Sequence, residues 1–303
     1  MADKQLLAIG AAHWDVQQKS INPVVMASSN PVACSRSMGG VARNVACDLG
    51  RLGHQAGLMS LWGDDLPGDE LQSSLQEQGL SLVPVARHGA LPTASYTAVL
   101  DCDGELLVGL ADMAIYDAFV PSSFVPHLME MQRYSHWFVD ANLPEESLSY
   151  LARQAPEKVF VAADCVSVAK CHRLVDLLPR VDLLFCNEAE IRALLKEGYD
   201  VGLETLGPRL LERFSVKAAV VSDGARGAWI FTGKKNPHHV PAVHVEKDYI
   251  VDVTGAGDAM IAGTLCGLLR GLELVDAVQR GMNASALCLQ YRGASPAEME
   301  LMA

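Results

Sequence analysis

Residues 251–258 have the sequence Val-Asp-Val-Thr-Gly-Ala-Gly-Asp and run directly into the apolar, small-residue stretch 259–269. The glycines predict a tight turn that opens a helix and brings the backbone close to a ligand. Free N–H groups at a helix start attract anions, whereas the carboxylate of Asp258 would repel a bound phosphate. Asp258 is well explained as a base that takes a proton from a hydroxyl while the amides hold a transferring phosphoryl group. On this segment alone, an ordinary helix start with a dipole-stabilised acid explains the residues equally well.

The composition limits the classes of partner. The chain has 303 residues, of which 50% are hydrophobic and 20% are charged, so it can bury a sizeable core. Its 24 basic and 36 acidic side chains give a net charge of −12, and no basic run is present. This balance argues against nucleic acid or an anionic membrane surface as the main partner, but it is compatible with ATP and Mg²⁺.

The lack of a recognisable targeting signal and the pattern of cysteines favour a cytoplasmic location. The apolar run at residues 6–10 is too short for a signal peptide, and no stretch approaches the length needed to span a bilayer. The eight cysteines are scattered without a CxxC pair, so reduced and buried thiols are expected. The nine histidines show no metal-ligand spacing, and His238 and His239 are expected in an exposed loop.

Short apolar runs alternate with helical segments through most of the chain. Strands are predicted at about 5–10, 56–61, 137–139, 159–163, 183–186 and 218–222. Helices are predicted at about 40–52, 64–78, 144–155, 170–178 and 187–196, and from Gly257 and Leu274 onward. Such alternation predicts an α/β fold in which helices cover both faces of a mostly parallel sheet.

One hairpin does not fit this alternation. Asp101-Cys102-Asp103-Gly104 lies between the apolar runs 93–100 and 106–110, which is a strong hairpin signal. Segments of about 14–36 and 93–113 are therefore expected to form a small β-sheet lid over a site. Because there is no internal repeat or convincing linker, residues 1–303 are predicted to form a single domain that carries this lid.

Three further clusters are each weak alone. A glycine pair, Gly39 and Gly40, opens a helix with Asn44 one turn in, which brings backbone close to a ligand. The segment 187–190, Asn-Glu-Ala-Glu, follows a predicted strand, where open α/β sheets bind ligands, although an N-cap with acidic residues explains it more simply. Residues 222–228 form a turn with two glycines, which by itself indicates only a hairpin.

In this order and at these separations, the four clusters resemble the ribokinase-like (PfkB) carbohydrate kinase family over essentially the whole chain. The resemblance implies a ribokinase-like three-layer α/β/α sandwich with a β-sheet lid that can also dimerise. It implies an ATP-dependent phosphotransferase that acts on the hydroxyl of a sugar or nucleoside. Since no Walker-type Gly-Lys-Ser/Thr is present, backbone amides and Mg²⁺ must meet the phosphate charge.

The resemblance also implies roles for individual residues. Asp258 matches the catalytic base, with an anion hole formed by Gly255, Ala256 and Gly257. The positions assigned to substrate are Asp15, Asn30, Gly39, Gly40, Asn44, Ser95, Asn142 and Lys170. The positions assigned to the nucleotide side are Asn187, Glu190, Ser222, Gly224, Gly227, Thr254 and, near the adenine, Asn283. Glu190 is expected to organise Mg²⁺ through water, and Asp252 is where some members bind a monovalent cation such as K⁺.

Three stretches resemble one branch of that family, the kinases that phosphorylate the 5′-hydroxyl of pseudouridine. They are residues 29–31, the lid residues 94–96, 104–108 and 112–113, and residues 164–171. A carbon-linked uracil needs amide-like partners, for which Asn30 and Asn142 are candidates. Local roles explain the same residues: a turn at Asn30, a helix cap at Asn142, and a solvent-facing or phosphate-binding Lys170.

Two departures from the family pattern concern the substrate. Met38 stands where many relatives have proline, and Ala42 stands where many have glycine. The extra methyl group either narrows the sugar pocket or is absorbed by a small backbone shift. The alternatives to a pseudouridine kinase are a kinase for ribose, adenosine or another carbohydrate, a catalytically inactive nucleoside-binding relative and, with least support, a structural protein that pairs through its lid.

Overall fold

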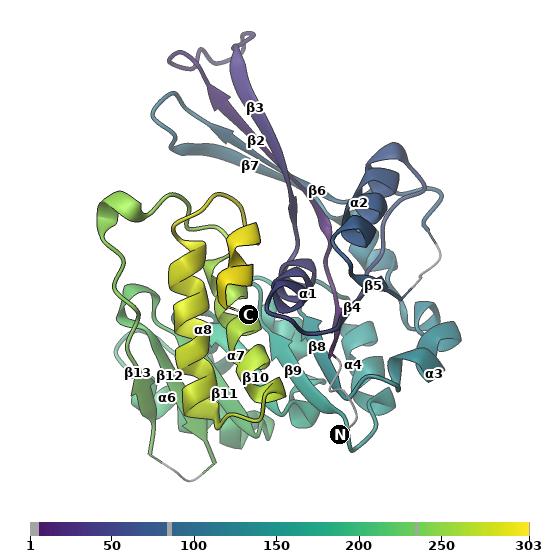
Figure 1. Ribbon diagram of the computed structural model, residues 1–303, viewed down its shortest axis with the longest axis vertical. Helices are drawn as coiled ribbons and strands as arrows, with labels where there is room; N and C mark the ends of the chain where they lie inside the picture. The colour runs from purple at the N-terminus through teal and green to yellow at the C-terminus, as the bar shows by residue number, and fades with distance from the viewer. Residues whose placement is uncertain (1–5, 84–86, 234–235, 303) are drawn as a thin grey trace.

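Nine strands form the main sheet of the computed structural model, which describes residues 6–83, 87–233 and 236–302 (Figure 1). Gln5, at the start of the first predicted strand, lies outside the described residues. The strands from β11 to β5 run parallel to one another, while β12 pairs antiparallel with β11 and β13 pairs antiparallel with β12. Across the sheet their order is β13 (His238–Val240), β12 (Ala228–Thr232), β11 (Ala218–Ser222), β10 (Leu183–Asn187), β9 (Phe160–Asp164), β8 (His136–Asp140), β1 (Leu6–Ile9), β4 (Ala56–Met59) and β5 (Ser81–Leu82).

Helices cover both faces of this sheet, which confirms the predicted three layers. Alternate residues of each strand point to opposite faces, so the buried side chains divide into two clusters. One cluster joins the sheet to α1 (Val41–Arg51), α2 (Leu66–Glu77), α7 (Ala256–Leu269) and α8 (Leu274–Cys288). The other joins it to α3 (Leu128–Met131), α4 (Glu145–Gln154), α5 (Glu188–Leu195) and α6 (Leu203–Phe214).

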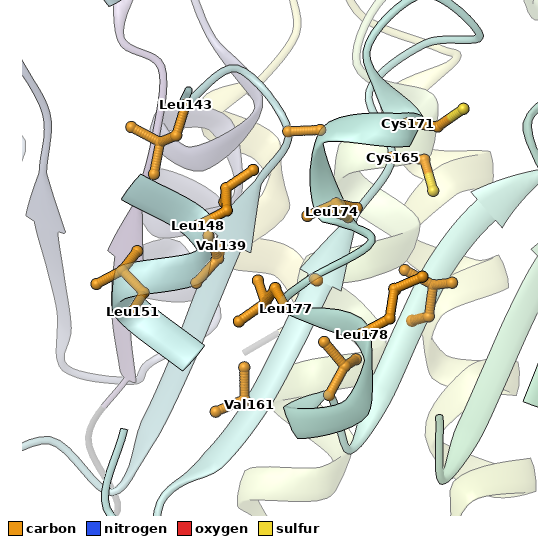
Figure 2. Close-up of a cluster of buried hydrophobic side chains, with 14 of the residues drawn as sticks. Val139, Leu143, Leu148, Leu151, Val161, Cys165, Cys171, Leu174, Leu177 and Leu178 are labelled. Atoms are coloured by element: carbon orange, nitrogen blue, oxygen red, sulfur yellow. The ribbon is translucent and has the colours of Figure 1, made fainter. Parts of the chain in front are cut away.

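Figure 2 shows part of the second cluster. Val139 on β8 and Val161 on β9 lie beside Leu148 and Leu151 of α4, and all four side chains are fully buried. Leu174 and Leu178, in the two 3₁₀ turns Cys171–Leu174 and Leu178–Arg180, and Leu177, just before the second turn, also belong to this cluster. A helix was predicted at 170–178, and these short turns replace it.

A second sheet of four strands stands apart from the main one (Figure 1). Its order is β3 (Val32–Gly39), β2 (His13–Ser20), β6 (Ser95–Leu100) and β7 (Leu106–Asp112). The hairpin predicted around residues 101–104 is confirmed as the connection from β6 to β7. Because β2 follows β1 closely and β3 leads into α1, the root of this sheet adjoins the carboxyl edge of the main sheet.

Two elements differ from the sequence expectations. His238 and His239 were expected in an exposed loop, but they lie in β13, where they pair with Ile230 and Trp229 of β12. Helix α6 was not predicted, although it packs against β11 and β12. In the described part of the chain, no helix combines the length and apolar character needed to cross a membrane.

Candidate active site

Four polar residues end neighbouring strands of the main sheet. Asp140 ends β8 and is paired in register with Asp164 at the end of β9, while Asn187 of β10 is paired with Ser222 of β11. Because parallel strands direct their carboxyl ends to one edge, these side chains form a row at that edge. This edge also receives the starts of α1 and α7, so it is the place where ligands are expected in such a sheet.

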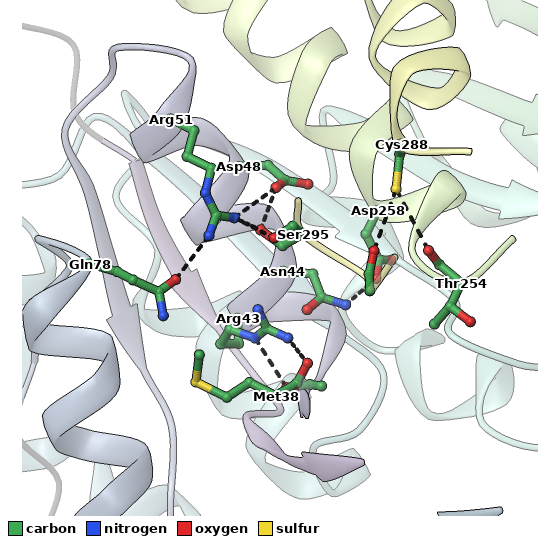
Figure 3. Close-up of polar contacts among 12 residues, drawn as sticks. Met38, Arg43, Asn44, Asp48, Arg51, Gln78, Thr254, Asp258, Cys288 and Ser295 are labelled. Carbon is green, nitrogen blue, oxygen red and sulfur yellow. Dashed lines mark hydrogen bonds and ion pairs between the residues drawn. The ribbon is translucent and has the colours of Figure 1, made fainter. Parts of the chain in front are cut away.

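Asp258 occupies the first turn of α7 at this edge. The turn is opened by Gly255, whose φ of 79° lies in the left-handed region that glycine favours. The side-chain amide of Asn44, from the first turn of α1, donates to Asp258 Oδ2 at 2.6 Å (Figure 3). Burial raises the pKa of Asp258 to about 7, with a smaller upward contribution from Asp48, against lowering by Asn44 and Arg43.

The two glycines of this turn have different surroundings. A Cβ on Gly255 would overlap the backbone of Ala294, and its positive φ disfavours any side chain. A Cβ on Gly257 would meet no atom within 4 Å. The space in front of Gly257 is therefore open, and the first amides of a helix have no intrahelical acceptor. A negatively charged group fits there.

The carboxylate of Asp140 accepts hydrogen bonds from three backbone N–H groups at this edge, and the sequence analysis did not identify it. Its fully buried Oδ2 accepts N–H bonds from Ala11 at 2.9 Å and from Ala42, in the first turn of α1, at 3.0 Å. Oδ1 accepts from Asn142 N at 2.9 Å. Burial raises the pKa of Asp140, while these backbone donors lower it. A Cβ on Gly10 would overlap the carboxylate, so glycine there allows the arrangement. The signal available in the sequence was an aspartate directly after a buried strand.

Asp15 lies on β2, at the root of the small sheet. A Cβ on Gly39 would overlap the Asp15 carboxylate, so glycine at 39 makes room for this acid. His13 lies between two groups, with Nε2 at 3.3 Å from Asp15 Oδ1 and Nδ1 at 3.4 Å from the Tyr116 hydroxyl. The buried Tyr116 hydroxyl also donates to the carbonyl of Ala12 at 2.8 Å. Asp15 is thus held at the edge in an ordered polar group.

Asn142 and Lys170 meet on the same side of the edge. Lys170 Nζ donates to Asn142 Oδ1 at 2.6 Å, and burial lowers the pKa of Lys170. The turn that carries Lys170 begins at Val166, whose φ of 62° is strained for a β-branched residue. Val166 N donates to Asp164 Oδ2 at 2.8 Å. A strained turn that presents a lysine at a ligand-binding edge favours a functional role for this segment.

The remaining substrate candidates on the small sheet lie at its two ends. Ser95, the first residue of β6, pairs with Trp14 beside Asp15 and so lies near the root. Asn30 lies in the loop between β2 and β3, at the far end. There its Oδ1 accepts from Val25 N at 2.8 Å and its Nδ2 donates to the carbonyl of Val25 at 3.0 Å. The structure brings Ser95 to the site and does not bring Asn30 there.

Asn187 and Glu190 form a capping box at the start of α5. Asn187 Oδ1 accepts from Glu190 N, while the Glu190 carboxylate accepts from both nitrogens of Asn187, all at 2.9 Å. Burial raises the pKa of Glu190. Burial and then the carboxylates of Glu190 and Asp258 raise the pKa of Asp164 well above its usual range. The Asp164 carboxyl therefore lies in the negative field of Glu190 and Asp258, which a divalent cation would neutralise.

Among the other nucleotide-side candidates, Ser222 ends β11, Gly224 and Gly227 lie in the turn between β11 and β12, and Asn283 lies on α8. Ser222 Oγ donates to the carbonyl of Cys186 at 3.4 Å. A Cβ on Gly224 would meet no atom within 4 Å, whereas one on Gly227 would overlap the carbonyl of Val240. Gly224 thus faces open space, and Gly227 is explained by the approach of β13. Asn283 is exposed on α8.

Asp252 holds the turn before α7. Its Oδ1 accepts from Thr254 N at 2.9 Å, and its Oδ2 accepts from Gly293 N at 3.1 Å. Both carboxylate oxygens therefore fasten backbone, and Thr254 itself is exposed. Among the described residues, no group of three or more histidine, cysteine or acidic side chains has the arrangement of a direct metal site.

Comparison with known proteins agrees with this geometry. The model of the pfkB family carbohydrate kinases matches residues 3–300. The pseudouridine kinase of Escherichia coli strain K12 is 30% identical over 292 residues, which cover 94% of this chain and 91% of that one. A carbohydrate kinase structure from Agrobacterium tumefaciens is 31% identical, with a TM-score of 0.83 and coverage of 96% and 92% of the two chains.

The fold is also that of more distant proteins. The ribokinase of Arabidopsis thaliana, solved with ribose and ATP, superposes with a TM-score of 0.85 at 20% identity and covers 99% of this chain and 98% of its own. This likeness confirms the ribokinase-like sandwich expected from the sequence.

Proposed function

Because the chain belongs to the pfkB family of carbohydrate kinases, and is an ATP-dependent phosphotransferase that acts on a sugar or nucleoside hydroxyl, we propose that it phosphorylates the 5′-hydroxyl of pseudouridine. In this proposal Asp258 takes the proton of the attacking hydroxyl. The hydroxyl oxygen forms the new bond to the γ-phosphorus of ATP, and the bond from that phosphorus to ADP breaks. The amides around Gly257 stabilise the charge on the transferring group.

The arrangement around Asp258 carries this proposal. A carboxyl whose pKa is about 7 can lose and regain a proton at neutral pH, as a general base requires. It lies on the same helical turn as the open space in front of Gly257. A base and an anion-binding backbone on adjacent residues suit a reaction in which a hydroxyl loses a proton as it attacks a phosphoryl group.

The acidic groups near Asp258 fit Mg²⁺ as a cofactor. Asp164 and Glu190 are held with raised pKa values, which a bound cation would lower. When bound, Mg²⁺ neutralises charge on the triphosphate. Asp252 remains a candidate for a monovalent cation such as K⁺, although its two oxygens already accept backbone N–H bonds.

Binding of the acceptor is assigned to the opposite side of the edge. Asp15 and Asn44 supply hydrogen-bond partners for sugar hydroxyls, beside the close backbone of Gly39 and Gly40. Asn142 and Lys170 offer an amide and a cation to the carbonyl and N–H groups of a uracil. Asn30 lies at the far end of the small sheet, away from these groups.

The substrate is tested by measuring ADP release from Mg-ATP with pseudouridine, uridine, adenosine, cytidine, ribose and fructose. We expect turnover on pseudouridine well above uridine, because the two differ in the atom that joins base to sugar. In Asn142→Ala, kcat/KM for pseudouridine is expected to fall at least about tenfold, since buried polar groups lose their partner. Its kcat/KM for ribose should change little.

If ribose or adenosine is preferred, the proposed substrate is wrong, but the proposed role of Asp258 as the base is unaffected. Absence of turnover on every compound, with binding retained, would favour the inactive nucleoside-binding relative. Equal effects of Asn142→Ala on pseudouridine and ribose would remove Asn142 from recognition of the base.

The small sheet supports a proposed homodimer. Strand β7 is exposed along its length, and Val108 and Leu110 on one of its faces are 45% and 55% exposed. Exposed apolar strands of this kind mark protein contacts. Light scattering is expected to give twice the mass of the 32.5 kDa chain, and Leu110→Asp is expected to shift it toward the monomer. A wild-type monomer at working concentrations would contradict the proposal.

A cytoplasmic location is also proposed. All eight cysteines are free thiols, and six of them are buried. Unpaired thiols suit a reducing compartment.

A further inference from the structure

The loop that follows α8 lies against the start of α7. Val251 N donates to the carbonyl of Leu289 at 2.8 Å, and Gly293 N donates to Asp252 Oδ2 at 3.1 Å. The backbone of Ala294 fills the space beside Gly255, where a Cβ would overlap it. This loop is therefore packed against the backbone that leads into Asp258.

Helix α1 holds the same loop from the other side (Figure 3). Ser295 Oγ donates to Asp48 Oδ1 at 2.5 Å. Arg51 Nη1 donates to the carbonyl of Ser295 at 2.7 Å and also contacts the Ser295 hydroxyl and, at 3.5 Å, the Asp48 carboxylate. These contacts join residues about 247 positions apart in the sequence, so they fix α1 and the loop relative to one another.

Asp48 is not explained by stability. Its side chain is fully buried, and Oδ2 has no hydrogen-bond partner in the described structure. A buried carboxylate with an unpaired oxygen destabilises a fold, so an apolar residue would serve a purely structural purpose better. Asp48 lies one helical turn after Asn44, whose amide holds Asp258. The buried carboxylate of Asp48 thus lies on the same helix as Asn44, one turn away from the side chain that contacts Asp258.

We propose that Asp48 and Ser295 are positioning residues of the phosphoryl-transfer site, which hold the loop 293–295 against the turn 252–258. Asp48 anchors Ser295, and the loop places Gly255 so that the following amides and Asp258 face the open space beside Gly257. Asp48 also adds negative charge behind Asp258. This inference rests on the proposed role of Asp258 as the base.

Kinetics of Ser295→Ala provide the first test. We expect kcat to fall at least about tenfold, because a small displacement of the reacting groups is costly in phosphoryl transfer. KM for the acceptor should stay within about twofold, since the acceptor residues are untouched. Ser295→Thr, which retains the hydroxyl, should restore most of the loss. Gln78→Ala is the matched control, because exposed Gln78 accepts from Arg51 Nη2 at 3.2 Å without touching the loop.

The pH profile of Asp48→Asn provides the second test. Asp258 faces Arg43 and Asp48 of α1, Asp140 of β8, Asp164 of β9 and Cys288 of α8, and burial raises the pKa of Asp48 itself to about 6, against lowering by Ser295, Arg51 and Arg43. Asparagine keeps an acceptor for Ser295 and removes the negative charge that raises the pKa of Asp258. The acid limb of kcat/KM should therefore move to lower pH, a change that a merely structural role would not produce.

Hydrogen exchange separates this inference from the proposed function. The amides of residues 251–258 should exchange about tenfold faster in Ser295→Ala than in Gln78→Ala, whether or not a substrate is known. Unchanged exchange would overturn the holding role. If Ser295→Ala and Asp48→Asn both keep the wild-type kcat and the wild-type acid limb, and only their Tm is lower, then Asp48 and Ser295 have a structural role alone. Failure of the proposed function would instead appear in Asp258→Asn, as turnover that persists.

Discussion

Asp258→Asn is expected to lower kcat by about three orders of magnitude, while binding of ATP and of the acceptor is retained. Asparagine has nearly the same shape and keeps an oxygen that can accept the hydrogen bond from Asn44 Nδ2, which lies 2.6 Å from Asp258 Oδ2. It cannot accept the proton of the attacking hydroxyl. The measurement is single-turnover phosphoryl transfer, with calorimetric titration of both ligands. Turnover near the wild-type rate would remove Asp258 from the role of base.

Stability supplies the control for that variant. The pKa of Asp258 is about 7 in the folded protein and near 3.8 in an unfolded chain. The folded state therefore holds the extra proton between these values, and its stability falls as pH rises from about 4 to about 7. Asparagine has no charge to bury, so Tm of Asp258→Asn at pH 8 should equal or exceed that of the wild type. A lower Tm would indicate structural damage instead of lost chemistry.

The same pKa fixes the acid limb of the wild-type pH profile. A base must be deprotonated to act, so kcat/KM should rise as pH passes through about 7 from below. The limb should be absent from any residual activity of Asp258→Asn. A wild-type limb near pH 4 would mean that the group that titrates is an ordinary exposed carboxylate.

The sequence predicted most of the main sheet because its strands are buried on both faces and carry continuous apolar runs, as in Leu6–Ile9. It failed where the pattern was short or interrupted. Strand β13 has only three residues and begins beside Pro237, so its histidines were expected in a loop. Helix α6 contains Pro208, a residue that argues against a helix from sequence alone.

The sequence predicted the type of site, but it did not predict many of the contacts within it. A glycine in the sequence indicates backbone freedom, but only the fold shows which group occupies the space that a side chain would fill. At Gly39 that group is the Asp15 carboxylate, and at Gly227 it is the carbonyl of Val240. Residues that act across long separations gave no local pattern. Asp140 gathers amides from residues 98 and 129 positions away, and Asp48 meets Ser295 at the other end of the chain. Such partners become visible only when the elements are packed.

Gly257→Ala is expected to lower kcat by roughly 10² to 10³-fold, comparable to the loss of one oxyanion-hole donor. The methyl group would occupy the open space in front of the first turn of α7, where the transferring group is proposed to lie. The backbone there is ordinary helix, so alanine should fold without strain and gain up to about 1 kcal/mol of helix stability. Activity and stability are thus expected to change in opposite directions, which single-turnover kinetics and thermal unfolding measure together.

Gly50→Ala is the matched control for this effect. Gly50 is also helical, in the last turn of α1, and a Cβ there would likewise meet no atom within 4 Å. It should raise Tm in the same way and leave kcat unchanged. Gly255→Ala is unsuitable as a control, since its Cβ would overlap Ala294 and disturb the fold. If Gly257→Ala and Gly50→Ala have equal, wild-type turnover, the space in front of Gly257 does not hold the phosphoryl group. The amides that stabilise it must then be sought elsewhere along the carboxyl edge, with Gly224 as the next open position.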